Sequence, residues 1–270
     1  MNRFGIIAGG GKLPLIIYNS LLKKNKETYI IGIKNNFNSK KIKNNFIEVK
    51  LGSLSKILNF LKKNKIKYLI FAGSIKRPGV MDFTLDFKAI NFLKNSRLDK
   101  LGDNNLLKII SNYFEKKGYK FINWNSYCPD LFAYDNFLTT KKPSKKAYEN
   151  LTKGLNVFKY YGKSDVGQSL IIQNNIILGL ESIEGTDNLI KRCVNYKRKG
   201  DKGILLKLMK YSQDIRFDLP TIGINTIKLI KKYNYEGIFI QKKYCLIIEK
   251  EKVIKFANTN NLFIAGVDQP

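Results

Sequence analysis

The feature of this sequence that most constrains its fold is the alternation of short apolar runs with helix-patterned segments through its first half. Buried strands are expected at four compact apolar runs, residues 4–8, 29–33, 68–72 and 121–124. Leucine and isoleucine recur at helical spacing in the segments between them, and Ser53 and Asp103 stand where two of these helices would begin. Such alternation predicts an α/β fold with a Rossmann-like parallel sheet, which binds ligands at the carboxyl ends of its strands.

The periodicity fades between residues 134 and 163, where Pro143, Ser144 and several lysines favour a linker. We therefore expect an N-terminal Rossmann-like domain over residues 1–133 and a C-terminal mixed α/β catalytic domain over 164–270. The second domain would open with a hairpin whose turn pair is Asn174-Asn175. Its remaining elements are expected at 203–208, 238–241 and 246–249 as strands and at 226–233 as a helix.

The chain contains no histidine, which removes Ser-His and Cys-His nucleophile pairs, imidazole bases and most transition-metal sites. Cys128, Cys193 and Cys245 lie far apart, so they fit neither a disulfide framework nor a zinc site and indicate a reduced compartment. Carboxylates and carbonyls remain as cation ligands, and they suit hard ions such as Mg²⁺ or Mn²⁺. No apolar run approaches the roughly 20 residues of a membrane span, and the product is expected in the cytosol.

The net charge of +28 is compatible with a protein that binds nucleic acid. Only six of the basic residues are arginine, however, and the abundant lysine occurs with much asparagine and isoleucine, as an AT-rich genome would produce. The charge is also spread along the chain without the signature of an RNA-binding module. It would equally help to recruit an anionic substrate or an anionic membrane leaflet.

A glycine loop joins the first strand to the first helix, where backbone N–H groups can cradle a phosphate. Its residues are Gly9, Gly10, Gly11 and Lys12. The loop fits neither the dinucleotide-binding nor the Walker A signature, and a simple close-packing turn is equally compatible with it. Arg77 follows the third strand, and its guanidinium group could bind a phosphate through two hydrogen bonds, although a solvated basic loop is the simpler interpretation.

Two acidic stretches stand out in the second half. In the first, Glu184 lies on a loop, Thr186 is placed to cap a helix, and Asp187 would lie in that helix's first turn, where it could simply complement the helix dipole. In the second, residues 213–220 read as extended chain would project Asp214, Arg216 and Asp218 to one face. Such a group could hold a cation beside a phosphate or form a structural ion-pair cluster.

Seven stretches occur together in one order: FGIIAGGGKLP, GSIKRP, GDNNLL, DVGQSLII, LESIEGTDNLIKR, QDIRFDLPTIG and LFIAGV. They resemble the UDP-2,3-diacylglucosamine pyrophosphatase family of LpxI type, over nearly the whole chain. The resemblance implies a lipid A biosynthesis enzyme that uses a divalent cation, usually magnesium. It would hydrolyse UDP-2,3-diacylglucosamine to UMP and 2,3-diacylglucosamine 1-phosphate (lipid X), with water attacking the phosphorus on the sugar side.

The resemblance also assigns one role directly, because Asp218 matches the family's essential aspartate. From this resemblance and the local sequence patterns, we expect the catalytic residues to be Asp218, Arg216, Asp214 and Glu184. The metal is expected at Asp218, Asp187 and Glu184. Substrate contacts are expected from Gly9, Gly10, Gly11, Lys12, Arg77, Asp165, Gln168, Thr186 and Gln213. Asn104 stands where an acidic residue is common in the family, which weakens a metal role there.

The expected partner is a lipid-linked UDP-sugar, which would bring a cytoplasmic enzyme to the inner face of the inner membrane, without nucleic acid. The sequence leaves the oligomeric state open, a homodimer included. One alternative is a Rossmann-type oxidoreductase, disfavoured by the glycine loop and by the lack of an acidic residue ending the second strand. The other is a basic nucleic-acid-binding protein, which should bind with a steep salt dependence.

Overall fold

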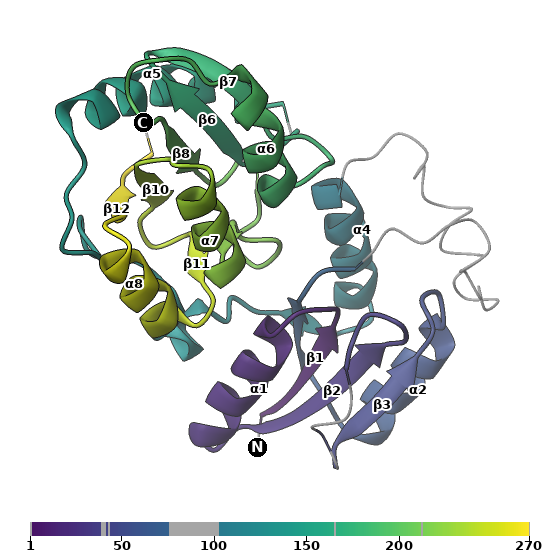
Figure 1. Cartoon of the computed structure of the whole chain (residues 1–270). Coiled ribbons are helices and arrows are strands. Elements are labelled where there is room, and N and C mark those ends of the chain that lie inside the picture. The colour runs from purple at the N-terminus through teal and green to yellow at the C-terminus, as the bar shows by residue number, and fades with distance from the viewer. Residues whose placement is uncertain are drawn as a thin grey trace. The chain divides into compact units, whose positions relative to one another are not determined.

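The computed structural model describes residues 2–38, 42, 44–75, 103–164, 166–211 and 213–269, with the backbone alone for 103–106. The chain forms two compact units. Unit 1 comprises Met1–Pro129 and Asp214–Asp218, and unit 2 comprises Asp130–Gln213 and Leu219–Pro270. A short segment from the C-terminal half of the sequence therefore belongs to the N-terminal unit. Figure 1 labels the elements of both.

Unit 1 is built on a five-stranded parallel sheet in the order β3-β2-β1-β4-β5. Its strands are β1 (Arg3–Ala8), β2 (Glu27–Ile33), β3 (Phe46–Val49), β4 (Tyr68–Ala72) and β5 (Lys120–Phe121). β1 pairs in parallel with both β2 and β4, and the chain order reverses between β1 and β4. The expected Rossmann-like parallel sheet is confirmed. The reversal is the topological switch point at which open α/β sheets bind ligands.

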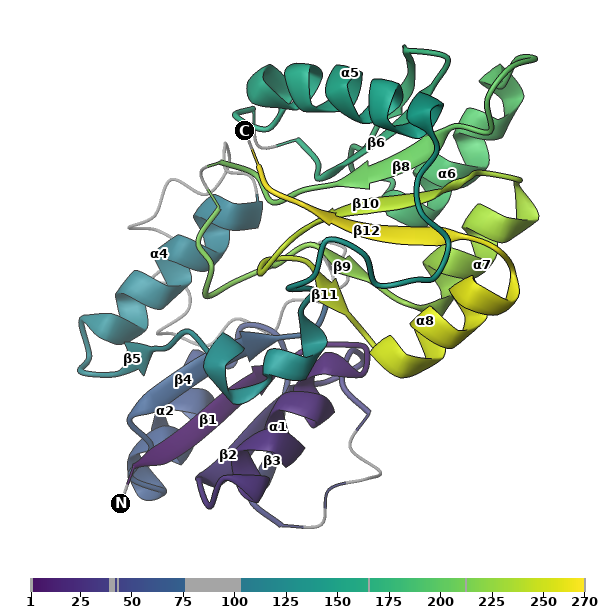
Figure 2. The same cartoon turned by 90° about the vertical axis from the view of Figure 1, so that its left-hand side faces the viewer.

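Helices cover both faces of this sheet (Figures 1 and 2). In the described part of unit 1 the helices are α1 (Leu13–Lys23), α2 (Leu54–Lys63) and α4 (Asp103–Glu115), and a 3-10 turn follows at Asn125–Tyr127. One core cluster joins the buried face of α2 and Phe114 of α4 to Ile7, Ile31 and Leu69 of the strands. α1 buries Pro14, Ile17 and Leu21 against β1 and β2.

Unit 2 contains a second five-stranded sheet in the order β12-β10-β8-β6-β7. The parallel strands are β8 (Ile204–Lys207), β10 (Gly237–Gln241) and β12 (Phe263–Val267), and the antiparallel ones are β6 (Ser169–Gln173) and β7 (Ile176–Leu180). β6 and β7 form the expected hairpin. Its turn residues Asn174 and Asn175 have φ of 51° and 60°, the left-handed pair that a tight hairpin requires. A two-stranded parallel sheet pairs β9 (Thr221–Ile222) with β11 (Leu246–Ile247).

Figure 2 shows α5 (Lys145–Tyr161) on one face of this sheet and α6 (Thr186–Cys193), α7 (Ile224–Lys232) and α8 (Lys250–Thr259) on the other. Short 3-10 turns stand at Pro129–Leu131 and Val194–Tyr196. Among the described residues, no helix combines the length and the apolar character that a membrane span needs.

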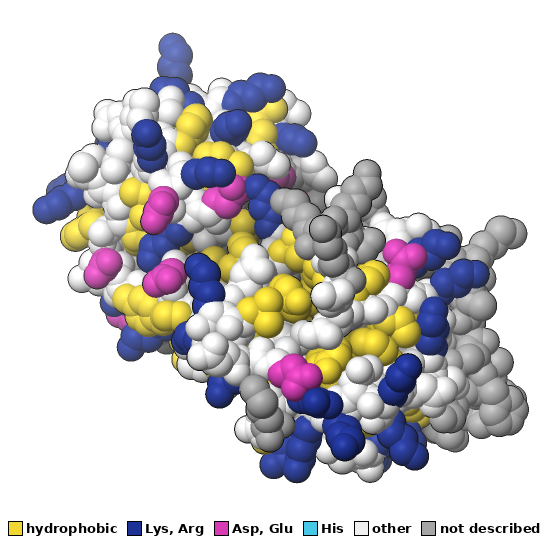
Figure 3. Space-filling model, turned by 90° about the horizontal axis from the view of Figure 1, so that it is seen from below, with side chains coloured by type: hydrophobic (Ala, Val, Ile, Leu, Met, Phe, Trp, Pro, Cys, Tyr) yellow, Lys and Arg dark blue, Asp and Glu magenta, His cyan; other side chains and the backbone are white. Residues whose placement is uncertain are grey.

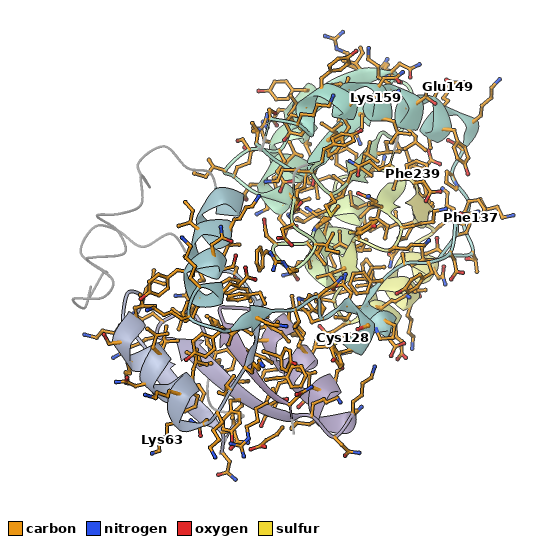
Figure 4. The ribbon with its side chains drawn as sticks, turned by 180° about the vertical axis from the view of Figure 1, so that it is seen from behind. Lys63, Cys128, Phe137, Glu149, Lys159 and Phe239 are labelled. Carbon is orange, nitrogen blue, oxygen red and sulfur yellow. The ribbon has the colours of Figure 1, made fainter. Side chains whose placement is uncertain are left out.

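The linker expected at 134–163 is wrong for most of its length, because α5 occupies residues 145–161 of unit 2. Ser144 caps the helix by accepting a hydrogen bond from the Ala147 backbone N–H at 3.1 Å. Leu151 and Phe158 pack in the same core cluster as Phe239 of β10. In Figure 4 the labelled Glu149 and Lys159 lie on the side of α5 away from Phe239. The buried apolar residues of α5 are few, and lysines and other polar residues stand between them in the sequence. The sequence therefore shows no clear helical periodicity here.

Candidate functional site

The loops that follow β1 and β4 are joined to each other by backbone hydrogen bonds. Gly9 N–H donates to Ala72 O at 2.8 Å, and Gly10 N–H donates to Ser74 O at 2.6 Å. In return, Ser74 N–H donates to Gly10 O at 3.1 Å. The carboxyl edge of the sheet beside the switch point is thus closed by a small backbone bridge.

This bridge explains why glycine is needed at Gly9 and Gly73. A Cβ built on Gly9 would lie 2.4 Å from Ser74 O, and one built on Gly73 would lie 2.4 Å from Gly10 O. Gly11 differs, because its Cβ would meet nothing within 4 Å and its φ of 89° is what calls for glycine. The N–H groups of Gly9 and Gly10 are therefore used by the bridge. Phosphate binding by Gly11 and Lys12 stays a prediction, and Arg77 lies outside the described residues.

Asp214–Asp218 is held in unit 1 by an aromatic anchor. Phe217 is 3% exposed and stacks edge-on against Phe71 of β4 and Phe121 of β5, at ring distances of 5.4 and 5.7 Å. Phe71 is the penultimate residue of β4, so the segment is docked at the carboxyl end of that strand. The segment that carries Asp218 thus reaches the edge of the sheet at which this fold class binds ligands.

The backbone of this segment turns, and the extended conformation expected for residues 213–220 is wrong. Phe217 N–H donates to Asp214 O at 3.0 Å, and Arg216 N–H donates to the Asp214 carboxylate at 3.0 Å. The Asp214 side chain thus accepts a hydrogen bond from the backbone N–H two residues on, as aspartate commonly does in turns. Side chains at alternate positions therefore do not simply share a face.

Arg216 is clamped between two carboxylates. Its Nε and Nη2 donate to the two oxygens of Asp214 at 3.0 and 2.7 Å, and its Nη1 donates to Glu115 Oε1 of α4 at 2.9 Å. Glu115 was not expected from the sequence, since it lies 101 positions away. Burial raises the pKa of Asp214, but hydrogen bonds from Arg216 outweigh it and lower that pKa overall.

Asp218 itself is exposed and has a φ of 35°. Positive φ is uncommon outside glycine, and aspartate and asparagine are among the residues that tolerate it best. Buried residues precede and follow it in sequence, Phe217 at 3% and Leu219 at 7% exposure. The backbone on both sides of Asp218 is consequently anchored while its side chain faces solvent.

In unit 2, Glu184 and Asp187 are each bound to a neighbour. Glu184 pairs with Arg192 at 2.6 Å on the surface. Asp187 accepts a hydrogen bond from Thr226 of α7 at 2.8 Å. Thr186 is not the helix cap that the sequence suggested, because α6 begins at Thr186 and Gly185, with a φ of 79°, holds the cap position. The Thr186 hydroxyl is used elsewhere.

That hydroxyl belongs to a buried polar cluster that the sequence did not reveal. Lys207 Nζ, at the end of β8, donates to Thr186 Oγ1 at 2.6 Å and to Ser169 Oγ at 3.1 Å. Thr186 in turn donates to Glu181 Oε1 at 2.8 Å, and Lys207 Nζ lies 3.7 Å from Glu181 Oε2. Lys207 and Glu181 are only 3% and 8% exposed. A lysine at the end of a strand is normally exposed to solvent, so the local sequence did not predict that Lys207 is buried.

Two of the expected substrate residues adjoin this cluster. Gln168 N–H donates to Glu181 Oε2 at 3.1 Å, and the Gln168 side chain donates to Gln213 Oε1 at 3.0 Å. Burial raises the pKa of Glu181, but the Lys207 charge and hydrogen bonds from Ser169, Thr186 and Gln168 lower it overall. The structure therefore brings Gln168, Thr186 and Gln213 together around Glu181. Asp165 lies outside the described residues.

The expected metal site stays a prediction. The carboxylates of Asp218, Asp187 and Glu184 are the right donor type for a hard cation. Within the part of the chain that the structure describes, however, no group of three or more carboxylate or cysteine side chains is gathered closely enough to hold a metal ion.

The cysteines offer no nucleophile. All three are buried, and burial raises the pKa of Cys193 to about 11 and that of Cys245 to about 12. Thiols with such pKa values stay protonated near neutral pH, and only the thiolate is an effective nucleophile. With histidine absent from the sequence, carboxylates are left as the most suitable acid-base groups.

Within each unit, the described basic side chains do not gather into a single patch on the face drawn in Figure 3. Lysine and arginine side chains are scattered there among apolar and uncharged polar surface. A nucleic-acid-binding face would be expected to concentrate them in a patch or stripe. This distribution disfavours the nucleic-acid alternative for that face.

Comparisons with known proteins agree with the two-part architecture. Residues 3–131 match the LpxI N-terminal domain, and residues 135–265 match the LpxI C-terminal domain. The chain is also similar to a UDP-2,3-diacylglucosamine pyrophosphatase, LpxI, of Caulobacter vibrioides. The two are 26% identical over 275 aligned residues, covering 99% of this chain and 98% of the relative. With both domains matched in order and nearly end to end, the chain belongs to the LpxI family.

Proposed function

We propose that this chain hydrolyses the pyrophosphate of UDP-2,3-diacylglucosamine, giving UMP and 2,3-diacylglucosamine 1-phosphate. The observation that carries the proposal is the family match across both domains, together with a relative of nearly equal length whose name states this activity. The anchored, solvent-facing Asp218 supports it, because this residue matches the family's essential aspartate.

Asp218 is assigned the central chemical role. Its carboxylate would position the attacking water or the cation, while the Arg216 clamp holds the segment in place. A divalent cation, when bound, would offset negative charge on the pyrophosphate and acidify water. Water would attack the phosphorus on the sugar side, and the phosphate-binding groups would need mainly to orient and stabilise charge.

The switch-point loops of unit 1 are assigned to the phosphate or uridine part of the substrate. Gly11 and Lys12 open onto the N-terminus of α1, which favours anions. Gly9 and Gly10 would act indirectly, by holding this loop against the one after β4. Arg77 follows the same loop in sequence and is expected to contribute a cationic contact.

The acyl chains of such a substrate would place the enzyme at a membrane surface. We propose peripheral association with the inner leaflet through the bound lipid, assisted by the excess of lysine. The same lysines would attract the pyrophosphate, because a positive protein raises the local concentration of an anionic substrate.

A phosphorus NMR assay tests the activity directly. Purified protein with Mg²⁺ and UDP-2,3-diacylglucosamine should yield UMP and the sugar 1-phosphate, and a UDP-sugar without acyl chains serves as the specificity control. Excess chelator should abolish turnover, and Mg²⁺ or Mn²⁺ should restore it. Full activity in chelator would refute the metal requirement alone, whereas no cleavage in any cation would refute the proposed reaction.

A further inference from the structure

The buried Lys207 of unit 2 has no role in the proposed chemistry, yet its ammonium group contacts the side chains of Ser169, Thr186 and Glu181. We propose that Lys207 is a positioning residue, whose charge fixes Thr186 and Glu181 and thereby the 181–187 loop in the shape that the reaction needs. This inference rests on the proposed function for its activity readout, and its structural readout stands independently.

The location of Lys207 makes a simple stabilising role unconvincing. Its Cα partner across the sheet is Ser169 of β6, and Ser169 is fully buried. Moving an ammonium and a carboxylate out of water costs several kcal/mol each, and well-packed apolar residues often stabilise such a site better. Because Glu181 Oε2 stands 3.7 Å away, the pair lacks a close direct hydrogen bond. A buried pair of this kind is better suited to specifying one arrangement than to adding stability.

The hydrogen bonds from Lys207 through Thr186 to Glu181 have a single direction, whereas either hydroxyl could donate in the Ser169–Thr186 contact at 3.3 Å. Lys207 donates to the Thr186 hydroxyl, which therefore directs its own proton to Glu181. Glu181 uses its other oxygen to accept from Gln168 N–H. Since Lys207 has only donors and an ionised Glu181 has only acceptors, no alternative orientation of Thr186 satisfies both. The start of α6 is thus fixed in position by a charge from the sheet.

This fixed point lies within the loop that carries expected site residues. Glu184 is three positions after Glu181, and Asp187 follows Thr186 directly. Gln168 extends the arrangement to Gln213, the residue before the segment that bears Asp218. A shift of the loop would therefore displace Glu184, Asp187 and Gln168 together. Misplacement of about 1 Å can reduce turnover by a factor of roughly 100.

A cycle of variants separates positioning from stability. Lys207→Met alone leaves Glu181 buried without its cation, so both the melting temperature and kcat should fall. The double variant Lys207→Met with Glu181→Gln removes both charges and should regain most of the melting temperature. Positioning predicts that its kcat nevertheless stays at least tenfold below that of the unaltered chain. Recovery of kcat together with stability would overturn the proposal.

A pair of variants at Thr186 keeps the test decisive if the double variant folds poorly. Thr186→Ser keeps the hydroxyl, whereas Thr186→Val keeps the shape and loses the hydroxyl, so kcat of Thr186→Val should lie at least tenfold below that of Thr186→Ser. Equal kcat in the two would overturn the proposal.

Hydrogen exchange gives the readout that does not need turnover. Peptides covering 181–187 should exchange faster in Thr186→Val than in Thr186→Ser, at equal melting temperature. Unchanged exchange would refute Lys207-dependent positioning even if the chain proved to have no pyrophosphatase activity. Faster exchange in a chain without that activity would instead refute the proposed function and leave the positioning role standing.

Discussion

Asp218 combines an exposed carboxylate with a backbone conformation that most side chains avoid, at a φ of 35°. The choice of substitution therefore matters. Alanine would remove the carboxylate and also add strain of roughly 1–2 kcal/mol, because its Cβ disfavours positive φ. Asparagine tolerates this region much as aspartate does and changes only the charge. It is the substitution that isolates chemistry from backbone strain.

Asp218→Asn should lower kcat by about 10²- to 10⁴-fold, the range expected when a positioned acid-base group is lost. Its melting temperature should stay within about 2 °C of the unaltered chain, and Asp218→Ala should melt lower than Asp218→Asn. Thermal unfolding and single-turnover rates on the same preparation provide the measurement. A well-folded Asp218→Asn enzyme with near-normal turnover would remove Asp218 from the mechanism.

At the scale of elements, the clamp on Arg216 joins a turn from the second half of the chain to α4 of unit 1. A lysine at this position could pair with one carboxylate but could not reproduce the planar fork that meets Asp214 and Glu115 together. Because Phe217 anchors the turn independently, the segment should stay docked while its details shift. Replacing Arg216 by lysine should therefore reduce the catalytic rate more than the stability of the fold.

Arg216→Lys is accordingly expected to reduce kcat/KM by about 10- to 100-fold through displacement of Asp218. Glu115→Gln, which keeps an oxygen acceptor for Arg216, should have a smaller effect. Lys252→Met is the matched control, since it breaks a surface pair with Glu249 at 2.7 Å at the start of α8, and such surface pairs contribute little. Equal kcat/KM for Arg216→Lys and the control would contradict a positioning role for the clamp.

The contrast between these elements and the hairpin shows what local sequence patterns can predict. β1, β2, β4 and the β6–β7 hairpin were predictable because apolar runs and the Asn174-Asn175 turn are signals contained within a few residues. The buried face of α5 was not, because its partners lie on strands far along the chain. The same holds for the site, since the Glu115–Arg216 and Lys207–Thr186 contacts join residues separated by 101 and 21 positions.

At the scale of the whole molecule, each unit carries a buried or half-buried carboxylate whose pKa is lowered by a cation, Asp214 in unit 1 and Glu181 in unit 2. A carboxylate with a lowered pKa in the folded state stabilises the fold above its ordinary pKa, near 4. That stabilisation is lost as the pH falls through the lowered folded-state value. Both units should therefore lose stability in acid, each through its own carboxylate.

The single tryptophan allows the two contributions to be measured separately. Trp124 is 3% exposed and lies in unit 1, so its fluorescence reports unfolding of that unit, while far-ultraviolet circular dichroism reports both. In urea unfolding at pH 7, 5, 4 and 3, the urea concentration at the midpoint of the fluorescence transition should decrease once the pH is below 4.

Asp214→Asn should lower that midpoint at pH 7 and flatten its decline in acid, because a neutral side chain no longer gains a proton on unfolding. Glu181→Gln should leave the fluorescence midpoint unchanged and alter only the circular dichroism transition. If both substitutions shifted both signals equally, the two units would unfold as one, and the separate carboxylate contributions inferred here would be wrong.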